Sequence, residues 1–563
     1  MKILYCLVWS CLLIFVNCDS LIVNTKSGPV KGVLQRTCKG GKLYRSYRGI
    51  PYAEPPIGDL RFEVPIPKKS WLETLDAKEY KPACCVLNQS VAFPLNTTQS
   101  EDCLYLNIFV PVKAKQDCLL PVMFFIHGGA YTEGDGQSGY YGPEPIMEEG
   151  GVILVTIDYR LGPLGFMNFE MCGLTGNMGL KDQQLGLIWT KRNIRRFGGN
   201  PDAITVFGQS AGGVSTHLHV LNKHSRKCIN RAICMSGTAV SYFAHYSPNH
   251  QLELMYDVFK DELNGARNPK ALYKLLKTIR LELLLEKTPA YVLNINVFIL
   301  YWTPVIENKK IAKDPFLTKP PRKIYQETHI HTPIVFGVTS AELLSLMMPQ
   351  SLYFWFESLK NSSSIILPFH GLTLPQNSSL YISSQRIIYE FYFGKHGIEQ
   401  TDYYLNQFVQ MVSDIVFVYP FYDAMRLHKN AKTFCYHMNL DLNLNFVKIE
   451  RSLQMIHGMG HIEEMPYLFH SYAHQELYDN IKQNPNDPKN IQTEHAMKIV
   501  PKYFIDFAKS GTMDKCGRVK GDSIICTDFT NKGLELIRKP KKHAMNMLNR
   551  IYERVKPWIV DQF

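Results

Sequence analysis

Short apolar runs recur along the chain and alternate with longer stretches whose apolar residues have helical spacing. The short runs predict buried strands, because they are rich in β-branched and aromatic residues. Helices are predicted within residues 176–197 and 408–428 and over most of residues 236–331. Strands alternating with helices predict an α/β fold, with a large, mostly parallel central sheet and helices on both faces. The predicted strands lie at Val122–Ile126, Val152–Ile157, Ile204–Phe207, Arg231–Met235, Thr332–Phe336 and Thr433–His437, with one more after Glu101.

The chain before these strands shows two other patterns. Alternation from Leu21 to Val33 predicts a hairpin. The proline-rich segment Tyr47–Pro56 predicts an ordered loop or a sheet edge, because proline cannot donate a hydrogen bond within a central strand. The chain contains no internal repeat or flexible linker, so residues 19–563 are predicted to form a single domain. Its helical insertions are expected to form a lid over the carboxyl edge of the sheet.

The first 18 residues predict a secretory signal peptide. Lys2 is followed by an uncharged run that ends at Val16, which is too short to cross a bilayer. No later apolar run is long enough to span a membrane, and the polar last residues argue against a lipid-anchor signal. We therefore expect a secreted, extracellular protein without a membrane anchor. Sequons for N-glycosylation agree with this route and begin at Asn88, Asn96, Asn361 and Asn377.

The cysteines indicate disulfide bonds. Three of the 14 cysteines lie in the predicted signal peptide, so an odd number remains and at least one is unpaired or bonded to another chain. We predict that Cys103 pairs with Cys84 or Cys85, and Cys516 with Cys526. No spacing of cysteine and histidine resembles a zinc site, and no metal is predicted.

The formal net charge of +12 raises the possibility of a nucleic-acid partner. No recognised nucleic-acid-binding module occurs in the sequence, so no such partner is predicted. The densest basic stretch, Arg538–Lys542, precedes a predicted C-terminal helix. We interpret it as a solvated helix face.

The segment from Ile204 to Gly213 reads ITVFGQSAGG and is the strongest candidate for chemistry. A short strand leads into Gly208-Gln209-Ser210-Ala211-Gly212, which fits the pattern G-x-S-x-G. In that pattern a strand turns sharply into a helix and leaves the serine at the tip of the turn. Ser210 is therefore a candidate nucleophile.

A serine nucleophile needs donors for the oxyanion that develops during attack. The sequence His127-Gly128-Gly129-Ala130 directly follows a predicted strand. Backbone N–H groups of Gly128 and Gly129 can approach a substrate carbonyl there, and the N–H of Ala211 can supply a third hydrogen bond.

The serine also needs a base and an acid that orients it. His457 and His461 both lie on a glycine-rich loop late in the chain, and His461 is the better candidate for the base. The acid is expected after a strand, between the serine and the histidine in sequence. Glu342 has this position, and Glu307 or Asp314 could compete with it.

The chain resembles the carboxylesterase/cholinesterase family, within the α/β-hydrolase superfamily, over nearly all of its length after the signal peptide. The motifs that carry the resemblance are long and occur in the family's order. They are YRGIPYAEPPIGDLRF (47–62), EDCLYLNIFVP (101–111), HGGAY (127–131), DYRLGPLGF (158–166), GNMGLKDQQLGLIW (176–189), RFGGNPDAITVFGQSAGG (196–213) and GMGHIEEMPYLF (458–469).

The resemblance implies roles for individual positions. It makes Ser210 the nucleophile, Glu342 the acid and His461 the base, with the oxyanion bound by Gly128, Gly129 and Ala211. It also implies that Ser236 is a buried serine that supports the triad by hydrogen bonding.

The sequence departs from the family's pattern in several places. Leu343 follows the acid where glycine is usual, and Gln209 stands where many members have glutamate. The segment from Cys85 to Cys103 lacks the tryptophan with which cholinesterases bind a quaternary ammonium, so a cholinesterase is not expected. Tyr242 and Phe243 occupy positions where the family has acyl-pocket residues. His217 and His219 follow Ser210 on its helix and are interpreted as packing residues.

The resemblance implies a secreted serine hydrolase, similar to insect esterases, that cleaves small, apolar carboxylic esters through an acyl-enzyme intermediate. No cofactor is implied. Two alternatives are a specific hormone hydrolase similar to juvenile-hormone esterases and a non-catalytic binding or adhesion member of the family. The sequence does not indicate an oligomeric state.

Overall fold

A computed structural model describes most of the 563 residues. The predicted signal peptide, three of the four predicted glycosylation sites (Asn88, Asn96 and Asn361) and Cys516 lie outside the described residues. The described residues are 21–87, 97–115, 117–245, 249–289, 291–294, 297–346, 354, 356–359, 367, 369, 372–395, 398–399, 401–513, 517–521 and 523–559.

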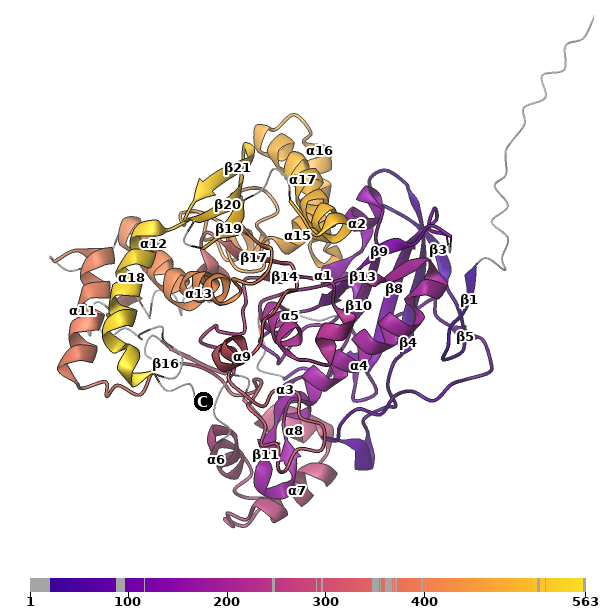
Figure 1. Cartoon of the computed structure of the whole chain (residues 1–563), viewed down its shortest axis with the longest axis horizontal. Helices are drawn as coiled ribbons and strands as arrows, with labels where there is room; N and C mark the ends of the chain where they lie inside the picture. The colour runs from indigo at the N-terminus through magenta and orange to yellow at the C-terminus, as the bar shows by residue number, and fades with distance from the viewer. Residues whose placement is uncertain are drawn as a thin grey trace, which may run out of the picture.

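A sheet of 12 strands forms the centre of the molecule (Figure 1). Its order is β21-β20-β19-β18-β17-β14-β13-β9-β10-β8-β4-β3. The strands from β18 to β10 in this order are parallel to one another, while β8 is antiparallel to β10 and β19 is antiparallel to β18. The predicted α/β architecture is confirmed. The strands are β3 (Val33–Arg36), β4 (Leu43–Pro51), β8 (Tyr105–Pro111), β9 (Leu120–Ile126), β10 (Ile153–Ile157), β13 (Gly199–Gln209), β14 (Arg231–Met235), β17 (Ile334–Thr339), β18 (Thr433–Asn439), β19 (Arg518–Lys520), β20 (Ser523–Thr530) and β21 (Gly533–Arg538).

Smaller sheets lie outside this one. The predicted N-terminal hairpin is present as β1 (Ile22–Asn24) and β2 (Pro29–Lys31), which pair antiparallel. The remaining short strands are β5 (Leu75–Asp76), β6 (Ala83–Cys84), β7 (Gln99–Ser100), β11 (Asn168–Phe169), β12 (Leu174–Thr175), β15 (Tyr291–Asn294) and β16 (Val297–Leu300).

The prediction that residues 47–56 form a loop or a sheet edge is confirmed. Residues 47–51 are the last part of β4 and, among the described strands, pair only with β8, because the register with β3 ends at Ser46. The strand tolerates Pro51 because that residue is its last, where a missing N–H costs no ladder bond within the strand. The pairing with β8 is irregular between Tyr47 and Ile50, where Gly49 has φ +70°.

Helices connect the strands and cover the sheet. In Figure 1, α6, α7 and α8 form a group below the sheet, while α11, α12 and α18 lie together to its left. The helices before residue 300 are α1 (Ser138–Tyr141), α2 (Glu144–Glu149), α3 (Gly162–Phe166), α4 (Met178–Asn193), α5 (Ala211–Leu221), α6 (Asn249–Val258), α7 (Pro269–Thr278) and α8 (Leu281–Lys287). Those after it are α9 (Pro321–Glu327), α11 (Ser379–Phe393), α12 (Asp402–Ser413), α13 (Tyr419–Leu427), α14 (Phe446–Glu450), α15 (Met465–Leu468), α16 (Gln475–Gln483), α17 (Pro488–Ser510) and α18 (Lys542–Val555).

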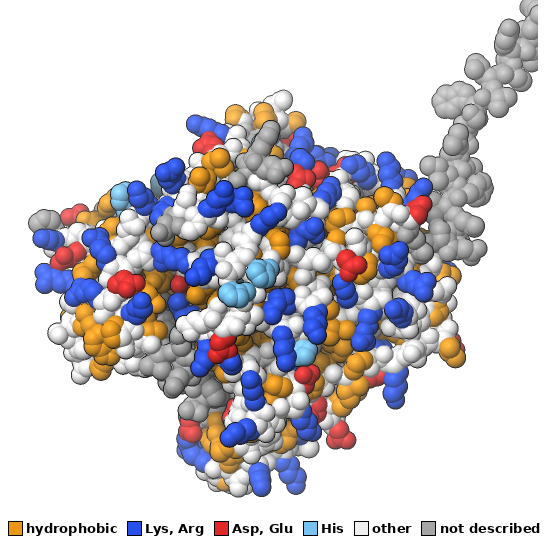
Figure 2. All heavy atoms as spheres, viewed as in Figure 1, with side chains coloured by type: hydrophobic (Ala, Val, Ile, Leu, Met, Phe, Trp, Pro, Cys, Tyr) orange, Lys and Arg blue, Asp and Glu red, His pale blue; other side chains and the backbone are white. Residues whose placement is uncertain are grey.

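The surface carries much of the net positive charge. Figure 2 shows Lys and Arg side chains spread over one face, with acidic side chains sparse between them. The predicted basic stretch before the C-terminal helix is not wholly solvated, however. Lys541 lies 3.6 Å from the buried carboxylate of Asp414, so this residue forms an ion pair inside the helical region.

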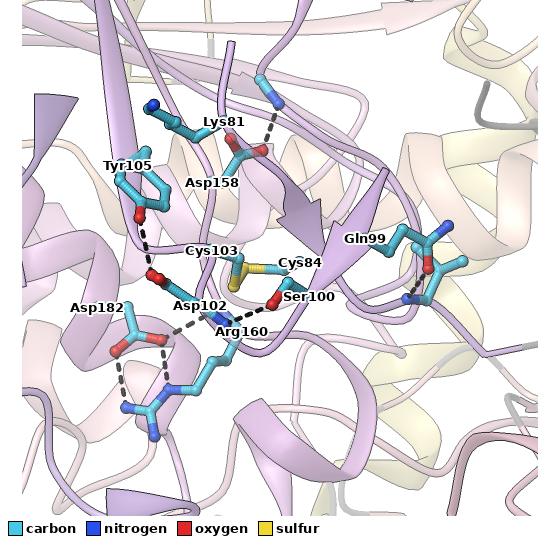
Figure 3. The surroundings of a disulfide bond; sticks show 12 residues. Lys81, Cys84, Gln99, Ser100, Asp102, Cys103, Tyr105, Asp158, Arg160 and Asp182 are labelled. Carbon is cyan, nitrogen blue, oxygen red and sulfur yellow. Dashed lines mark hydrogen bonds and ion pairs between the residues drawn. A yellow bond between two sulfur atoms is a disulfide. The ribbon is translucent and has the colours of Figure 1, made fainter. Parts of the chain in front are cut away.

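Two disulfides are present among the described residues. Cys84 is bonded to Cys103 (Figure 3). Cys85 is a buried free thiol whose pKa is raised to about 12 by burial. The prediction for Cys526 is wrong, because its partner is Cys435 rather than Cys516. Strands β18 and β20 run parallel with Tyr436 opposite Thr527, so the two cysteines one residue earlier lie side by side.

Polar contacts hold the surroundings of the Cys84–Cys103 bond together (Figure 3). The hydroxyl of Tyr105 donates to Asp102 at 2.8 Å. The guanidinium of Arg160 donates two hydrogen bonds to Asp182, of 2.8 Å from Nε and 2.7 Å from Nη2, and both side chains are buried. These two hydrogen bonds between opposite charges offset the free-energy cost of removing both charges from water.

Candidate active site

Ser210 lies at the turn between β13 and α5, at the carboxyl edge of the sheet. Its backbone has φ 59° and ψ −124°, a conformation that L residues rarely adopt and that strains the chain. The turn is held at its base, where the Ser210 N–H donates to the carbonyl of Met235 at 2.8 Å. Ser210 as a whole is half-buried.

The loop after β9 lies against this turn. A Cβ added at Gly128 would lie 3.1 Å from the Cβ of Ser210 and 2.6 Å from the carbonyl oxygen of Gln209, so only glycine allows this approach. Gly129 has φ +101°. Within the described part of the chain, the N–H groups of Gly128, Gly129 and Ala211 donate no hydrogen bond. They can therefore serve an anionic oxygen beside Ser210.

His461 and Glu342 are joined by a short hydrogen bond. Nδ1 of His461 donates to Oε2 of Glu342 at 2.6 Å, and both side chains are buried. Because a carboxylate accepts at Nδ1, the neutral ring has its lone pair at Nε2. The backbone N–H of His461 also donates to the carbonyl of Glu342, at 3.2 Å. This arrangement gives a base that is oriented by an acid.

The other candidates for the acid and the base have different surroundings. Glu307 forms a buried ion pair with Lys181 at 2.7 Å and accepts hydrogen bonds from the N–H groups of Phe316 and Leu317, of 2.6 and 3.1 Å. Asp314 and His457 are exposed.

The loop that carries His461 is held by a buried carboxyl group. Glu463 accepts hydrogen bonds from the N–H groups of Gly460 and Lys448, at 2.6 and 3.0 Å. Burial raises the pKa of Glu463 to about 7. Burial also raises the pKa of Glu464, its neighbour, well above the usual range, and the charge of Glu342 adds to this effect.

Gln209 contacts the other nitrogen of the histidine ring. Its side-chain nitrogen lies 3.2 Å from Nε2 of His461, and as an amide it donates to the ring's lone pair. The sequence identified Gln209 only as a departure from the family's pattern, because the histidine is 252 positions further along the chain.

Aromatic side chains border the histidine. The ring centroids of Phe417 and His461 are 4.9 Å apart, and those of Phe243 and Phe417 are 5.4 Å apart. Phe417 belongs to a turn of π-helix, Asp414–Val418, between α12 and α13. The sequence pattern predicts only a helix there and does not identify Phe417. Pro420 was an available signal, since a proline inside a helix disturbs its hydrogen-bond register.

His217 and His219 are buried on α5, and burial lowers the pKa of both. Nδ1 of His217 accepts from the N–H of Ala239 at 3.0 Å, in the loop that follows β14. His219 contacts the side chains of Ser225 and Gln183, at 2.8 and 3.0 Å. These contacts agree with the predicted packing role.

The described residues show neither a metal site nor a helix that could span a membrane. They contain no group of three or more His, Cys, Asp or Glu side chains arranged to hold a metal ion. None of their helices combines the length and apolar character that a membrane crossing needs. Asn377, the predicted glycosylation site that is described, is exposed in the turn before α11.

Known proteins are similar to this chain along most of its length. A model of the carboxylesterase family matches residues 19–548. A carboxylic ester hydrolase from Bombus ignitus is 35% identical over 390 residues, 67% of each chain. A juvenile hormone esterase from Heliothis virescens is 29% identical over 507 residues, 88% of this chain and 86% of the relative. The crystal structure of juvenile hormone esterase from Manduca sexta, with OTFP covalently attached, is 26% identical. It covers 96% of this chain and 100% of its own, with a TM-score of 0.79.

Proposed function

The chain belongs to the carboxylesterase family and is a carboxylic ester hydrolase with an α/β-hydrolase fold, and we propose that Ser210, His461 and Glu342 carry out its chemistry. The observation that carries this proposal is the 2.6 Å hydrogen bond from His461 to Glu342. It leaves the lone pair at Nε2 directed away from the acid, on a ring that also contacts Gln209, the residue before Ser210.

The proposed reaction has two halves. In the first, the Ser210 oxygen forms a bond to the ester carbonyl carbon while Nε2 of His461 takes the hydroxyl proton. The oxyanion accepts hydrogen bonds from the N–H groups of Gly128, Gly129 and Ala211. The carbon–alkoxy bond then breaks, and His461 gives its proton to the departing alcohol. In the second half, water attacks the acyl-serine by the same steps and releases the acid.

The contact between Gln209 and His461 must break during this reaction. Nε2 has one lone pair, and in the structure the Gln209 amide donates to it. Proton transfer from Ser210 therefore requires the amide contact to give way to the hydroxyl.

Hydrolysis of p-nitrophenyl acetate tests the proposal. We expect turnover by the wild-type protein, loss of turnover in Ser210→Ala, and progressive inactivation by an organophosphate. Ser215→Ala, on the same helix, is the matched control and should retain turnover. Turnover that survives in folded Ser210→Ala would overturn the assignment of the nucleophile, and a folded wild-type protein without turnover would favour a non-catalytic, binding role.

The substrate class follows from the aromatic residues beside the base. Phe417 and Phe243 present an apolar surface next to His461, which favours esters with apolar acyl groups. A specific hormone hydrolase is a second candidate, supported by the similarity to two juvenile hormone esterases along most of the chain. Comparing kcat/KM for juvenile hormone with values for simple acyl esters distinguishes the two. A hormone value no higher than those of simple esters would reject the specific role.

Secretion is part of the same proposal. Its support is the apolar N-terminal run in the sequence and the exposed position of Asn377. Expression in insect cells should place the protein in the medium with its N-terminus near Asp19, and Asn377→Gln should migrate faster on a denaturing gel. A protein that stays in the cell with Met1 intact would contradict secretion.

A further inference from the structure

We propose that the edge of the sheet opposite the candidate active site binds a linear sulfated polysaccharide. The residues that define this basic edge lie in three segments before β14, β17 and β18. They are Lys223, His224, Arg226, Lys227, Arg231, His329, His331, Lys429 and Lys432.

Two of the three segments carry Lys and Arg, the segment before β17 carries two histidines, and none of the three contains an acidic residue. Residues 222–231 read NKHSRKCINR, residues 328–333 read THIHTP, and residues 428–432 read HKNAK. They lead into three adjacent parallel strands, in which Ala232 is opposite Ile334 and Ile334 is opposite Thr433. Since neighbouring strands are about 4.8 Å apart, the segments lie within roughly 10 Å of one another along the edge. Charges far apart in sequence therefore gather on one side.

These charges have little compensation from the protein. Within the described part of the chain, none of the Lys and Arg residues of the basic edge forms an ion pair. Among the described residues, the Arg226 side chain donates to the main-chain carbonyls of Val220 and Leu221, at 3.0 and 3.2 Å. Nη1 of Arg231 is buried without a hydrogen-bond partner in the described residues. By contrast, Arg322 and Lys319, close by in sequence on or before α9, are paired with Asp423 and Glu327.

The loops of the basic edge are fixed to one another. Nδ1 of His331 lies 3.2 Å from the carbonyl oxygen of Asn430, and Nδ1 of His329 lies 3.1 Å from its side-chain nitrogen. The rings of the two histidines are stacked, with their centroids 6.4 Å apart. These contacts join the loop before β17 to the loop before β18.

The chemistry of the edge favours a hydrated, linear polyanion over other anionic partners. The exposed large hydrophobic residues of the described chain all lie outside the three segments, so nothing here would insert into a bilayer. The segments contain no Phe, Tyr or Trp on which nucleic-acid bases could stack. A sulfated sugar chain requires only a row of cations. Figure 2 shows a face on which Lys and Arg side chains lie around neighbouring histidine side chains.

The position of the edge allows binding and catalysis together. Strand β13 runs from this edge toward Ser210, and the six residue-to-residue steps from Ile204 to Ser210 span about 20 Å at the usual rise of a strand. A polysaccharide along the strand starts would leave the carboxyl edge open. The inference does not depend on the ester chemistry, and its test does not require turnover.

Heparin affinity of the full chain tests the inference. The variant Lys227→Glu/Lys429→Glu/Lys432→Glu reverses three exposed charges of the edge. The variant Lys69→Glu/Lys274→Glu/Lys482→Glu makes the same change in net charge at exposed positions elsewhere. At about 0.15 M salt we expect the wild type to bind, the edge variant to lose at least about tenfold in affinity, and the control to lose less than about threefold. Unfolding temperatures of all three report on folding.

Three results would overturn the inference. A wild type that does not bind heparin rejects it outright. Equal losses in the two variants would mean that net charge, rather than the basic edge, determines binding. Tighter binding to vesicles of anionic phospholipid or to duplex DNA at the same salt, lost in the edge variant, would assign the edge to another class of partner.

Discussion

The hydroxyl of Ser236 donates a 2.7 Å hydrogen bond to Oε1 of Glu342, and both side chains are enclosed by protein. The N–H of Thr339 donates to the same oxygen at 2.8 Å, which leaves Oε2 for His461. Two neighbouring strands, β14 and β17, end at these donors. The position of the carboxylate, and with it the orientation of His461, is therefore set by the sheet.

Replacement of Ser236 by alanine should slow the reaction without changing substrate binding. The substitution removes one hydrogen bond to a charged group, worth about 1.5–3 kcal/mol, and frees the carboxylate to turn away from His461. We expect kcat for p-nitrophenyl acetate to fall at least about tenfold while KM changes little. Ser384→Ala removes another buried hydroxyl, on α11, and should leave kcat unchanged. An unchanged kcat in Ser236→Ala would show that Thr339 is sufficient.

Replacement of Gln209 by glutamate should change the pH dependence of the reaction. A carboxylate at this position would lie beside Nε2 of His461 and favour the protonated ring. The acidic limb of the kcat/KM profile should therefore move to higher pH, by about one unit. Gln209→Met keeps the size of the side chain without its charge and should not shift the limb in that direction. Identical profiles in the two variants would contradict the electrostatic explanation.

Buried histidines should make the folded protein sensitive to acid. Burial lowers the pKa of His428 from its ordinary 6.5 to about 4, so the folded state keeps it neutral where the unfolded chain takes up a proton. The contribution of His428 to the free energy of unfolding is fully present above about pH 6.5. It is lost as the pH falls toward 4, by up to about 1.4 kcal/mol per pH unit. The pKa values of His127 and His219 are lowered to about 4 and about 3 by the same cause.

Urea unfolding between pH 7 and pH 4 measures this effect. The free energy of unfolding of the wild type should decline across the range, and His428→Gln should decline less steeply because it lacks one of these titrating groups. The ring of His428 contacts Tyr325 and the carbonyl of Thr332, both at 2.8 Å, so the variant will also be less stable at pH 7. If the free energy of unfolding declined equally with pH in the wild type and in His428→Gln, His428 would not be one of the groups responsible.

The bond between Cys435 and Cys526 should stabilise the protein strongly. It closes a loop with a sequence separation of 91 residues, for which the chain-entropy estimate is about 4–5 kcal/mol. Cys526→Ser should lower the free energy of unfolding by an amount of this order and expose one additional reactive thiol in the denatured protein. Cys516→Ser should do neither. The opposite pattern would restore the pairing of Cys516 with Cys526.

Features that depend on neighbouring residues could be predicted from the sequence. The strands around Ile204 and Val122 follow from short apolar runs, and the turn at Ser210 follows from the small residues that its crowded backbone requires. The chain order of serine, acid and histidine restricted the candidates for the site. Local pattern was sufficient there, because each feature is determined within a few residues.

Tertiary structure decided which distant residues meet. Cys526 pairs with Cys435 because β18 and β20 are neighbours in the sheet, and strand order is not encoded in the apolar pattern of either strand. The same reason applies to Glu342 rather than Glu307 beside His461, and to the contact between Gln209 and the ring. The π-helical turn at Phe417 and the basic edge also arise only when segments far apart in sequence pack together.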